Sequence, residues 1–232
     1  MSNDSEFVYG FSSPECDYIL RHQIGLIQPR SIVDFGAGAG KVGKIAREVL
    51  EKNYKIEAVE GNDKTAQMLV REGQYHKVSN NLIQDWIEAN SDHHDLAVFG
   101  DVLEHLSTAE INRVMQKSIK IFDHIIIHVP LHEIFQDGGE AIPLETHRSY
   151  ITANFFDRYR PTEKHIISDM NRPIGIGRRW LMMNLYIPCK TPRLSIHRLL
   201  SYWLYHFSMV ILQKFGIAVP FIKVLRRIKY RK

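Results

Sequence analysis

The sequence predicts an α/β fold built on a doubly wound, mostly parallel sheet. Strand-like and helical patterns alternate five times within about 100 residues, and parallel strands need such helical crossovers. Seven strand-like runs can be counted, and the last two predict an antiparallel hairpin at the sheet edge. The 232 residues are 44% hydrophobic and 24% charged, which is typical of a globular protein with one substantial core.

The first 130 residues supply the alternation. Short apolar runs bounded by turn residues predict strands, and apolar residues spaced three or four apart predict helices. Pro14 suits a first helical turn, Asn62 or Asp63 can cap a helix, and Ser107 with Glu110 forms a capping box. The mixed segment 82–89 is left unassigned. In order, the expected elements are a helix at 14–28, a strand at 31–35, a helix at 41–52, a strand at 55–60, a helix at 63–72, strands at 75–79 and 95–100, a helix at 107–122 and a strand at 125–129.

The chain beyond Pro130 is less regular. A long loop at 131–149 comes first, followed by an expected helix at 150–159. Strand-like runs at 165–168 and 180–187 then flank a turn-rich segment and predict the edge hairpin. Loops of this length usually carry function, and this one follows a strand of the parallel sheet.

Charge divides the chain into an acidic body and a basic tail. The first 169 residues have a net charge of −9, whereas the final 63 contain 13 Lys and Arg and no acid. We expect a domain at 1–190 and a basic amphipathic helical tail at 191–232. The uncharged run 199–213 falls short of the roughly 18 residues that span a bilayer, and its aromatic residues suit an interface.

The tail is therefore expected to bind an anionic membrane surface. The alternative is that it packs on the domain or on a second subunit, and its large aliphatic side chains fit nucleic acid less well. The two cysteines, Cys16 and Cys189, form no disulfide framework, and the polar, acidic start is not expected to be a signal peptide. We expect a cytoplasmic protein, peripheral on the inner face of the membrane.

The segment 31–41, SIVDFGAGAGK, reads as a strand, a glycine turn and the start of a helix. Glycines suit a turn that reaches positive φ and lies close to a ligand. A P-loop does not fit, because Val42 stands where Ser or Thr is needed and Phe35 where the first glycine is needed. A dinucleotide fingerprint would use Gly38, Gly40 and Gly43, with Glu60 about 20 residues on, in an NAD-binding oxidoreductase.

A third interpretation includes the acid, so that the turn reads Asp34-x-Gly36-x-Gly38-x-Gly40. Here the sequence resembles the class I S-adenosylmethionine-dependent methyltransferases, whose fold is Rossmann-like. The string GDVLEHL at 100–106 is similar to a signature of methyltransferases related to ubiquinone O-methylation. The resemblance covers about residues 14–187 and implies S-adenosylmethionine as cofactor. The cofactor-binding residues that it implies are Asp34, Gly36, Gly38, Gly40, Glu60, Gly61, Asp85, Trp86 and Asp101.

The resemblance also implies roles for these residues. The turn backbone would wrap the methionine part of the cofactor, and Glu60 would accept hydrogen bonds from both ribose hydroxyls as a charged acceptor. The pair Asp85-Trp86 would flank adenine, a role for which Asn80-Asn81 competes. A plainer alternative is that the strand-end acids only cap the helices that follow.

Methyl transfer mainly requires alignment of donor and acceptor, together with a base where the acceptor carries a proton. His105, one turn past the fourth strand, is the first candidate, and His147 in the long loop is the second. The structural alternatives are a helix-start histidine bonded to backbone for His105 and a surface partner of Glu145 for His147.

A more specific hypothesis is that these residues bind a metal ion. The spacing of Asp101, Glu104 and His105 can place three ligands on one helical face. The pattern resembles the E-x-x-E-H metal site of small-RNA 2′-O-methyltransferases, with His147 as the fourth ligand, although Asp101 replaces a Glu. The resemblance implies a divalent cation that holds a diol or catechol-like acceptor.

These observations lead us to expect a methyltransferase that acts on an oxygen of a small-molecule, sugar or lipid-linked acceptor. Alternatives of other classes are the NAD-binding oxidoreductase and a non-catalytic scaffold with the cofactor fold at a membrane. Binding of S-adenosylmethionine or of NADH separates the three.

The tail makes the first testable prediction. Truncation after Pro192 should abolish cosedimentation with anionic liposomes, because the truncated chain loses the polybasic segment. Liposomes of neutral lipid serve as the control. Retained binding of the truncated protein to anionic liposomes would contradict the assignment of the tail as an anchor.

Overall fold

The computed structural model describes residues 14–51, 53–131, 143–173 and 179–189. The chain divides into the units Met1–Thr191 and Pro192–Lys232, and all described residues belong to the first. The predicted tail at 191–232 lies outside the described residues. Within the described ranges, the helices are too short or too polar to cross a bilayer.

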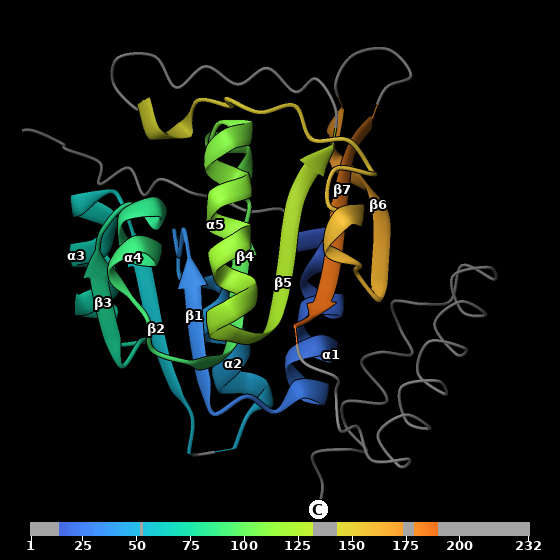
Figure 1. The fold of residues 1–232 in the computed structure, drawn as a ribbon. Helices are drawn as coiled ribbons and strands as arrows, with labels where there is room; N and C mark the ends of the chain where they lie inside the picture. The colour runs from blue at the N-terminus through green and yellow to red at the C-terminus, as the bar shows by residue number, and fades with distance from the viewer. Residues whose placement is uncertain (1–13, 52, 132–142, 174–178, 190–232) are drawn as a thin grey trace, which may run out of the picture. The chain divides into compact units, whose positions relative to one another are not determined.

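A seven-stranded sheet forms the centre of the domain, in the order β3-β2-β1-β4-β5-β7-β6 (Figure 1). The first five strands pair in parallel, while β7 runs antiparallel to both β5 and β6. The predicted fold class and edge hairpin are therefore confirmed. The strands are β1 (Ser31–Phe35), β2 (Lys55–Glu60), β3 (Lys77–Asn80), β4 (His94–Gly100), β5 (Phe122–Leu131), β6 (Glu163–Pro173) and β7 (Arg179–Pro188).

Helices cover both faces of the sheet, as the doubly wound pattern predicts. On one face α1, α2 and α3 bury Ile24, Ile45 and Leu69 in a common cluster. On the other face, in front in Figure 1, α4 and α5 pack Trp86 and Ile111 against the sheet. The helices are α1 (Asp17–Ile27), α2 (Lys41–Val49), α3 (Asp63–Glu72), α4 (Ile83–Ala89) and α5 (Thr108–Ile121). Short 3-10 helices are η1 (Pro14–Cys16), η2 (Leu103–His105), η3 (Pro143–Glu145) and η4 (Asp157–Tyr159).

The predicted caps are present. The Asn62 side chain accepts the Thr65 N–H at the start of α3. Ser107 and Glu110 form the reciprocal capping box of α5. Both caps lie just beyond carboxyl ends of parallel strands, so they also fix the loops at that edge, which is uppermost in Figure 1.

The predicted helix at 150–159 is wrong. Its backbone N–H groups bond three residues back, as Phe155 N–H does to Thr152 and Asp157 N–H to Asn154, and only η4 is helical. These turns let Ile151 and Phe156 both reach the core. Elsewhere α2 ends three residues earlier than expected, at Val49, and the unassigned segment 82–89 contains α4.

Candidate cofactor and acceptor site

The glycine turn between β1 and α2 has a left-handed backbone. Gly36, Gly38 and Gly40 have φ values of 68°, 49° and 74°. A Cβ on Gly36 would lie 2.5 Å from a methyl of Val102, so no side chain fits there. The three predicted glycines thus form a bare loop of backbone at the carboxyl edge of the sheet, where the ligands of open α/β folds bind.

The carboxylate of Glu60 closes this turn from the end of β2. It accepts the N–H of Gly38 at 2.9 Å and the N–H of Asn62 at 2.8 Å. Burial raises the pKa of Glu60, and these backbone N–H groups oppose that rise. A carboxylate can accept about four hydrogen bonds, so Glu60 keeps capacity for hydroxyl donors of a ligand. The structure therefore brings Glu60 and the glycine turn together.

Asp34 lies beneath the turn and faces the protein interior. Its side chain is 1% exposed and accepts a 2.6 Å hydrogen bond from the Tyr75 hydroxyl. Burial is the main cause that raises the pKa of Asp34 to about 7. This geometry favours a supporting role for Asp34 beneath the turn over direct contact between its carboxylate and a ligand.

Leucines from two loops flank Gly61, the residue after Glu60. A Cβ on Gly61 would lie 3.0 Å from Leu82 and 3.4 Å from Leu144. Both leucines are partly open to solvent, with exposed fractions of 39% and 44%. Leu82 follows the Asn80-Asn81 pair that competes for the adenine position. No sequence signal points to Leu144, which arrives from the segment after β5.

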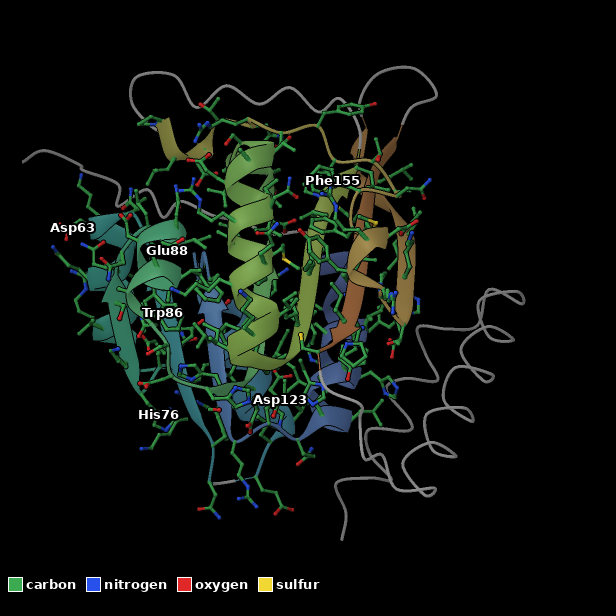
Figure 2. All side chains as sticks on the ribbon, viewed as in Figure 1. Asp63, His76, Trp86, Glu88, Asp123 and Phe155 are labelled. Carbon is green, nitrogen blue, oxygen red and sulfur yellow. The ribbon has the colours of Figure 1, made fainter. Side chains whose placement is uncertain are left out.

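Trp86 is buried where it was expected to flank adenine, whereas the expected role of Asp85 stays a prediction. Trp86 is 2% exposed, donates its indole N–H to Glu57 at 2.8 Å and packs edge-on against Phe35 (Figure 2). Asp85 is exposed on α4. Because α4 begins at Ile83, position 86 faces the sheet, where Trp86 joins the core cluster.

Two buried carboxylates follow β4. Asp101 has a φ of 49°, which is unusual for a residue with a side chain, and its N–H donates to the carbonyl of His128. Neither carboxylate oxygen of Asp101, nor Oε2 of Glu104, has a hydrogen-bond partner among the described residues. Burial, reinforced by the charge of Asp101, raises the pKa of Glu104 well above its usual value. Unpaired buried carboxylates are costly, so this position suits a ligand that supplies donors.

Residues 143–149, which we call the strap, dock on the residues after β4 (the yellow segment above the sheet in Figure 1). The N–H groups of Arg148 and Ser149 donate to the carbonyl of Glu104 at 2.8 and 3.1 Å. The rings of His105 and His147 lie 5.0 Å apart between centroids. Thus both predicted histidines meet at one site, with Asp101 and Glu104 preceding His105 on the same segment.

The His105 ring is set up to accept a proton. Its Nδ1 lies 3.3 Å from the carbonyl of Thr146, which can only accept, so a hydrogen on Nδ1 would bond there and would leave the lone pair on Nε2. Burial lowers the pKa of His105, and the Thr146 carbonyl opposes that decrease. The Nε2 atom of His105 lies 3.9 Å from Oε1 of Glu104. A neutral imidazole is the form required of a general base.

Glu104, His105 and His147 can each offer one ligand atom, and these atoms lie within 4.8 Å of one another. Oε2 of Glu104 has no hydrogen-bond partner among the described residues. Asp101 is not a member of this group, so the predicted four-residue set is reduced to three.

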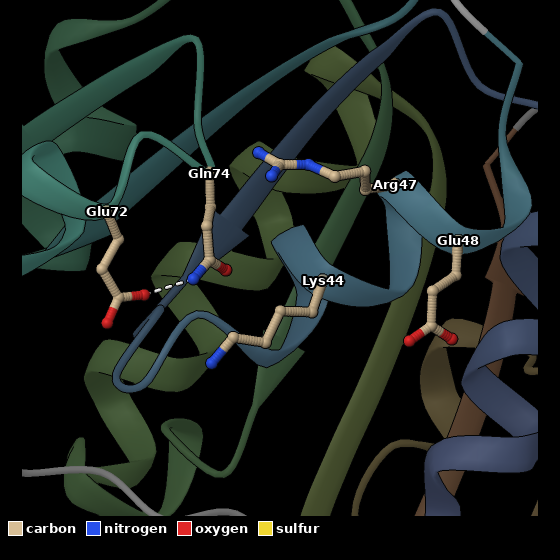
Figure 3. Close-up of a pocket in the computed structure, with 5 residues that line it drawn as sticks. All are labelled: Lys44, Arg47, Glu48, Glu72 and Gln74. Atoms are coloured by element: carbon tan, nitrogen blue, oxygen red, sulfur yellow. Dashed lines mark hydrogen bonds between the residues drawn. The ribbon is translucent and has the colours of Figure 1, made fainter.

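A hollow of about 440 Å³ lies elsewhere, between α2 and the end of α3 (Figure 3). Its lining is Lys44, Arg47, Glu48, Glu72 and Gln74, with a hydrogen bond between Gln74 and Glu72. None of the predicted cofactor-binding residues lines it, so it is separate from the candidate site.

The placement of Trp86 is testable. Trp86→Phe should lower the free energy of unfolding by about 1–3 kcal/mol, because a buried hydrogen bond and packing are lost, while affinity for S-adenosylhomocysteine stays unchanged. Leu82→Ala should do the reverse, weakening that affinity with little loss of stability. Urea unfolding and calorimetry check the pair. Weakened binding in Trp86→Phe would restore the adenine role.

Comparisons with known proteins identify the fold. No protein-family model and no curated protein sequence matches the chain. Solved structures do match. The plantazolicin methyltransferase BamL, in complex with S-adenosylhomocysteine (SAH), has a TM-score of 0.51 and 11% identity over 77% of this chain and 86% of its own. The N-terminal domain of EvdMO1 with SAH bound has a TM-score of 0.53 and 10% identity, over 77% and 83% of the two chains. A SAM-dependent methyltransferase from Archaeoglobus fulgidus has a TM-score of 0.51 and 13% identity, over 73% and 92%. The chain therefore has the fold of the class I S-adenosylmethionine-dependent methyltransferases.

Proposed function

We propose that the protein is an S-adenosylmethionine-dependent methyltransferase. The observation that carries this proposal is the Glu60 carboxylate bonded to Gly38 N–H, at the mouth of a turn with three left-handed glycines. This arrangement offers backbone to an amino-acid moiety and a charged acceptor to ribose hydroxyls. Two neighbours of the same fold hold SAH, which supports this choice of cofactor.

A dinucleotide is less well supported. Gly43, the third glycine of that fingerprint, is explained by packing, because a Cβ there would lie 2.9–3.2 Å from atoms of the Tyr75 ring. Its N–H also bonds to the Tyr75 hydroxyl and is not presented to a phosphate. The scaffold alternative leaves the unpaired carboxylates of Asp101 and Glu104 unexplained.

In the proposed reaction S-adenosylmethionine supplies an activated methyl group on sulfur. The methyl–sulfur bond breaks as a bond to the acceptor oxygen forms, and SAH leaves with the bonding electrons. The glycine turn and Glu60 hold the donor, so that the reactants meet in line. His105 Nε2 takes the proton of the acceptor hydroxyl, and His147 lies beside it to orient the acceptor.

The acceptor is proposed to be an oxygen of a small molecule, sugar or lipid-linked compound. Hydroxyl groups would satisfy the buried acceptor atoms of Asp101 and Glu104. The N-terminal domain of EvdMO1 has been crystallised in the presence of SAH and D-fucose, and BamL in complex with a triazolic desmethylPZN analog. These neighbours support a small-molecule or sugar acceptor. The basic tail would bring the protein to a cytoplasmic membrane surface.

As an alternative to His105 as the base, a divalent cation is proposed at Glu104, His105 and His147. One carboxylate and two imidazoles are suitable ligands for a divalent first-row metal. Oxygen atoms of the substrate would complete its coordination. A cation bound there would polarise an acceptor hydroxyl. His105 would then serve as a ligand, and the proton would pass to another base.

Cofactor binding tests the proposed function. Glu60→Gln should weaken SAH binding by roughly 10- to 100-fold, because a charged hydrogen-bond acceptor is lost. Wild-type affinity should also decline as pH falls, beginning above pH 4.5, since burial raises the pKa of Glu60 and its neutral form accepts less well. Calorimetry provides the measurement, and Glu88→Gln, on the exposed side of α4, is the matched control. Binding of NADH but not of SAH would contradict the proposal.

The cation makes a separate prediction. Protein treated with EDTA should bind one equivalent of Mn²⁺, detected by electron paramagnetic resonance, and His147→Ala should weaken it at least tenfold. His93→Ala is the control, since His93 pairs with Asp123 away from this cluster. Absence of saturable Mn²⁺ binding would show that these residues hold no cation, without affecting the cofactor assignment.

A further inference from the structure

The N-cap residue of helix α2 has no side chain that could cap the helix. Its N-cap is Gly40, in a left-handed conformation, and no side-chain cap bond forms there. The first backbone N–H groups of a helix need partners, which Ser, Thr, Asn or Asp usually supply. A side chain at Gly40 would be strained at a φ of 74° and would lie 2.9 Å from Gln74. The turn therefore has to obtain its cap from another element.

Tyr75, between α3 and β3, supplies that cap. Its hydroxyl accepts the N–H of Gly43, the third residue of α2, at 3.2 Å. The same hydroxyl donates to Oδ2 of Asp34, the residue two before Gly36, at 2.6 Å. One buried group thus bridges the end of β1 and the first turn of α2, the two elements between which the glycine turn runs.

Packing keeps Tyr75 in this position. The residue is 8% exposed, and its ring lies directly against Gly43. The neighbouring His76 is fixed at the sheet, because its N–H donates to Ile56 O and its Nδ1 accepts the Ile56 N–H. The bridge therefore comes from a segment that is itself anchored to β2.

We infer that Tyr75 is a positioning residue, which holds the glycine turn in its cofactor-binding shape through Asp34 and Gly43. This inference rests on the proposed function. A turn of glycines has many accessible conformations, so a fixed cap at one end lowers the cost of ordering it when the cofactor binds.

Removal of the hydroxyl alone tests the inference. Tyr75→Phe keeps the ring but loses both bonds, and it should weaken SAH binding about tenfold in calorimetry, the size expected for hydrogen bonds of this kind. Tyr186→Phe is the matched control, because it removes a hydroxyl bonded to His124 in the same core cluster, away from the turn. Asp34→Asn retains an acceptor oxygen for Tyr75 and should bind more tightly than Tyr75→Phe.

Two further measurements separate positioning from general destabilisation. In Tyr75→Phe the Gly43 amide should exchange hydrogen faster, whereas the Lys44 amide, bonded to Gly40 O, should not change. Asp34 is faced by Tyr75, by Lys41 of α2 and by Glu60 of β2, and its pKa is about 7. The Tyr75 bond lowers that pKa, so the carboxyl signal of Asp34 in nuclear magnetic resonance should titrate at higher pH in the variant.

The outcomes are distinct. If Tyr75→Phe binds SAH with the same affinity as the wild type, the inference is overturned and the proposed function stands. An equal loss of affinity in Tyr186→Phe would also overturn it, since the effect would then be general. Failure of the wild type itself to bind SAH would overturn the proposed function and the inference together.

Discussion

The glycine turn carries no side chain larger than those of Ala37 and Ala39, so groups from other elements help to set its shape. Glu60 of β2 holds the Gly38 N–H, and Tyr75 holds the Gly43 N–H. Val102, after β4, occupies the space beside Gly36. A ligand that enters this turn meets backbone and one carboxylate. The proposed cofactor side therefore depends on the sheet, because pairing of β1 with β2 and β4 brings these groups together.

The proposed acceptor side, after β4, depends on a different physical principle. Asp101 and Glu104 carry buried carboxylate oxygens without partners among the described residues, and Asp101 is held at positive φ. Each feature costs stability, and a fold with a large two-sided core can tolerate such costs. The neutral ring of His105 lies beside them. Under the proposed function, proton acceptance and recognition of hydroxyl groups would therefore share one small, buried region.

The sequence was sufficient for the fold because its signals are local. Strand–helix alternation and the caps at Asn62 and Ser107 need no tertiary information, and the structure has them where predicted. Glu60 meets the turn for a similar reason, since both lie at carboxyl ends of adjacent parallel strands. The assignment of Trp86 failed because it depended on where α4 begins, and one turn of helix moves a side chain from the edge into the core. Leu144 and Tyr75 could not be found from sequence, because only packing brings them to the site.

The strap connects the two sides of the candidate site. Leu144 lies beside Gly61 at the cofactor end, while His147 contacts His105 and two strap N–H groups bond to Glu104 at the acceptor end. Under the proposed function, a ligand that displaced one end of this segment would change the energy of the other end, and binding at the two ends would be linked. The affinity of the turn for the demethylated cofactor would then depend on whether the acceptor position is occupied, and the reverse would hold equally.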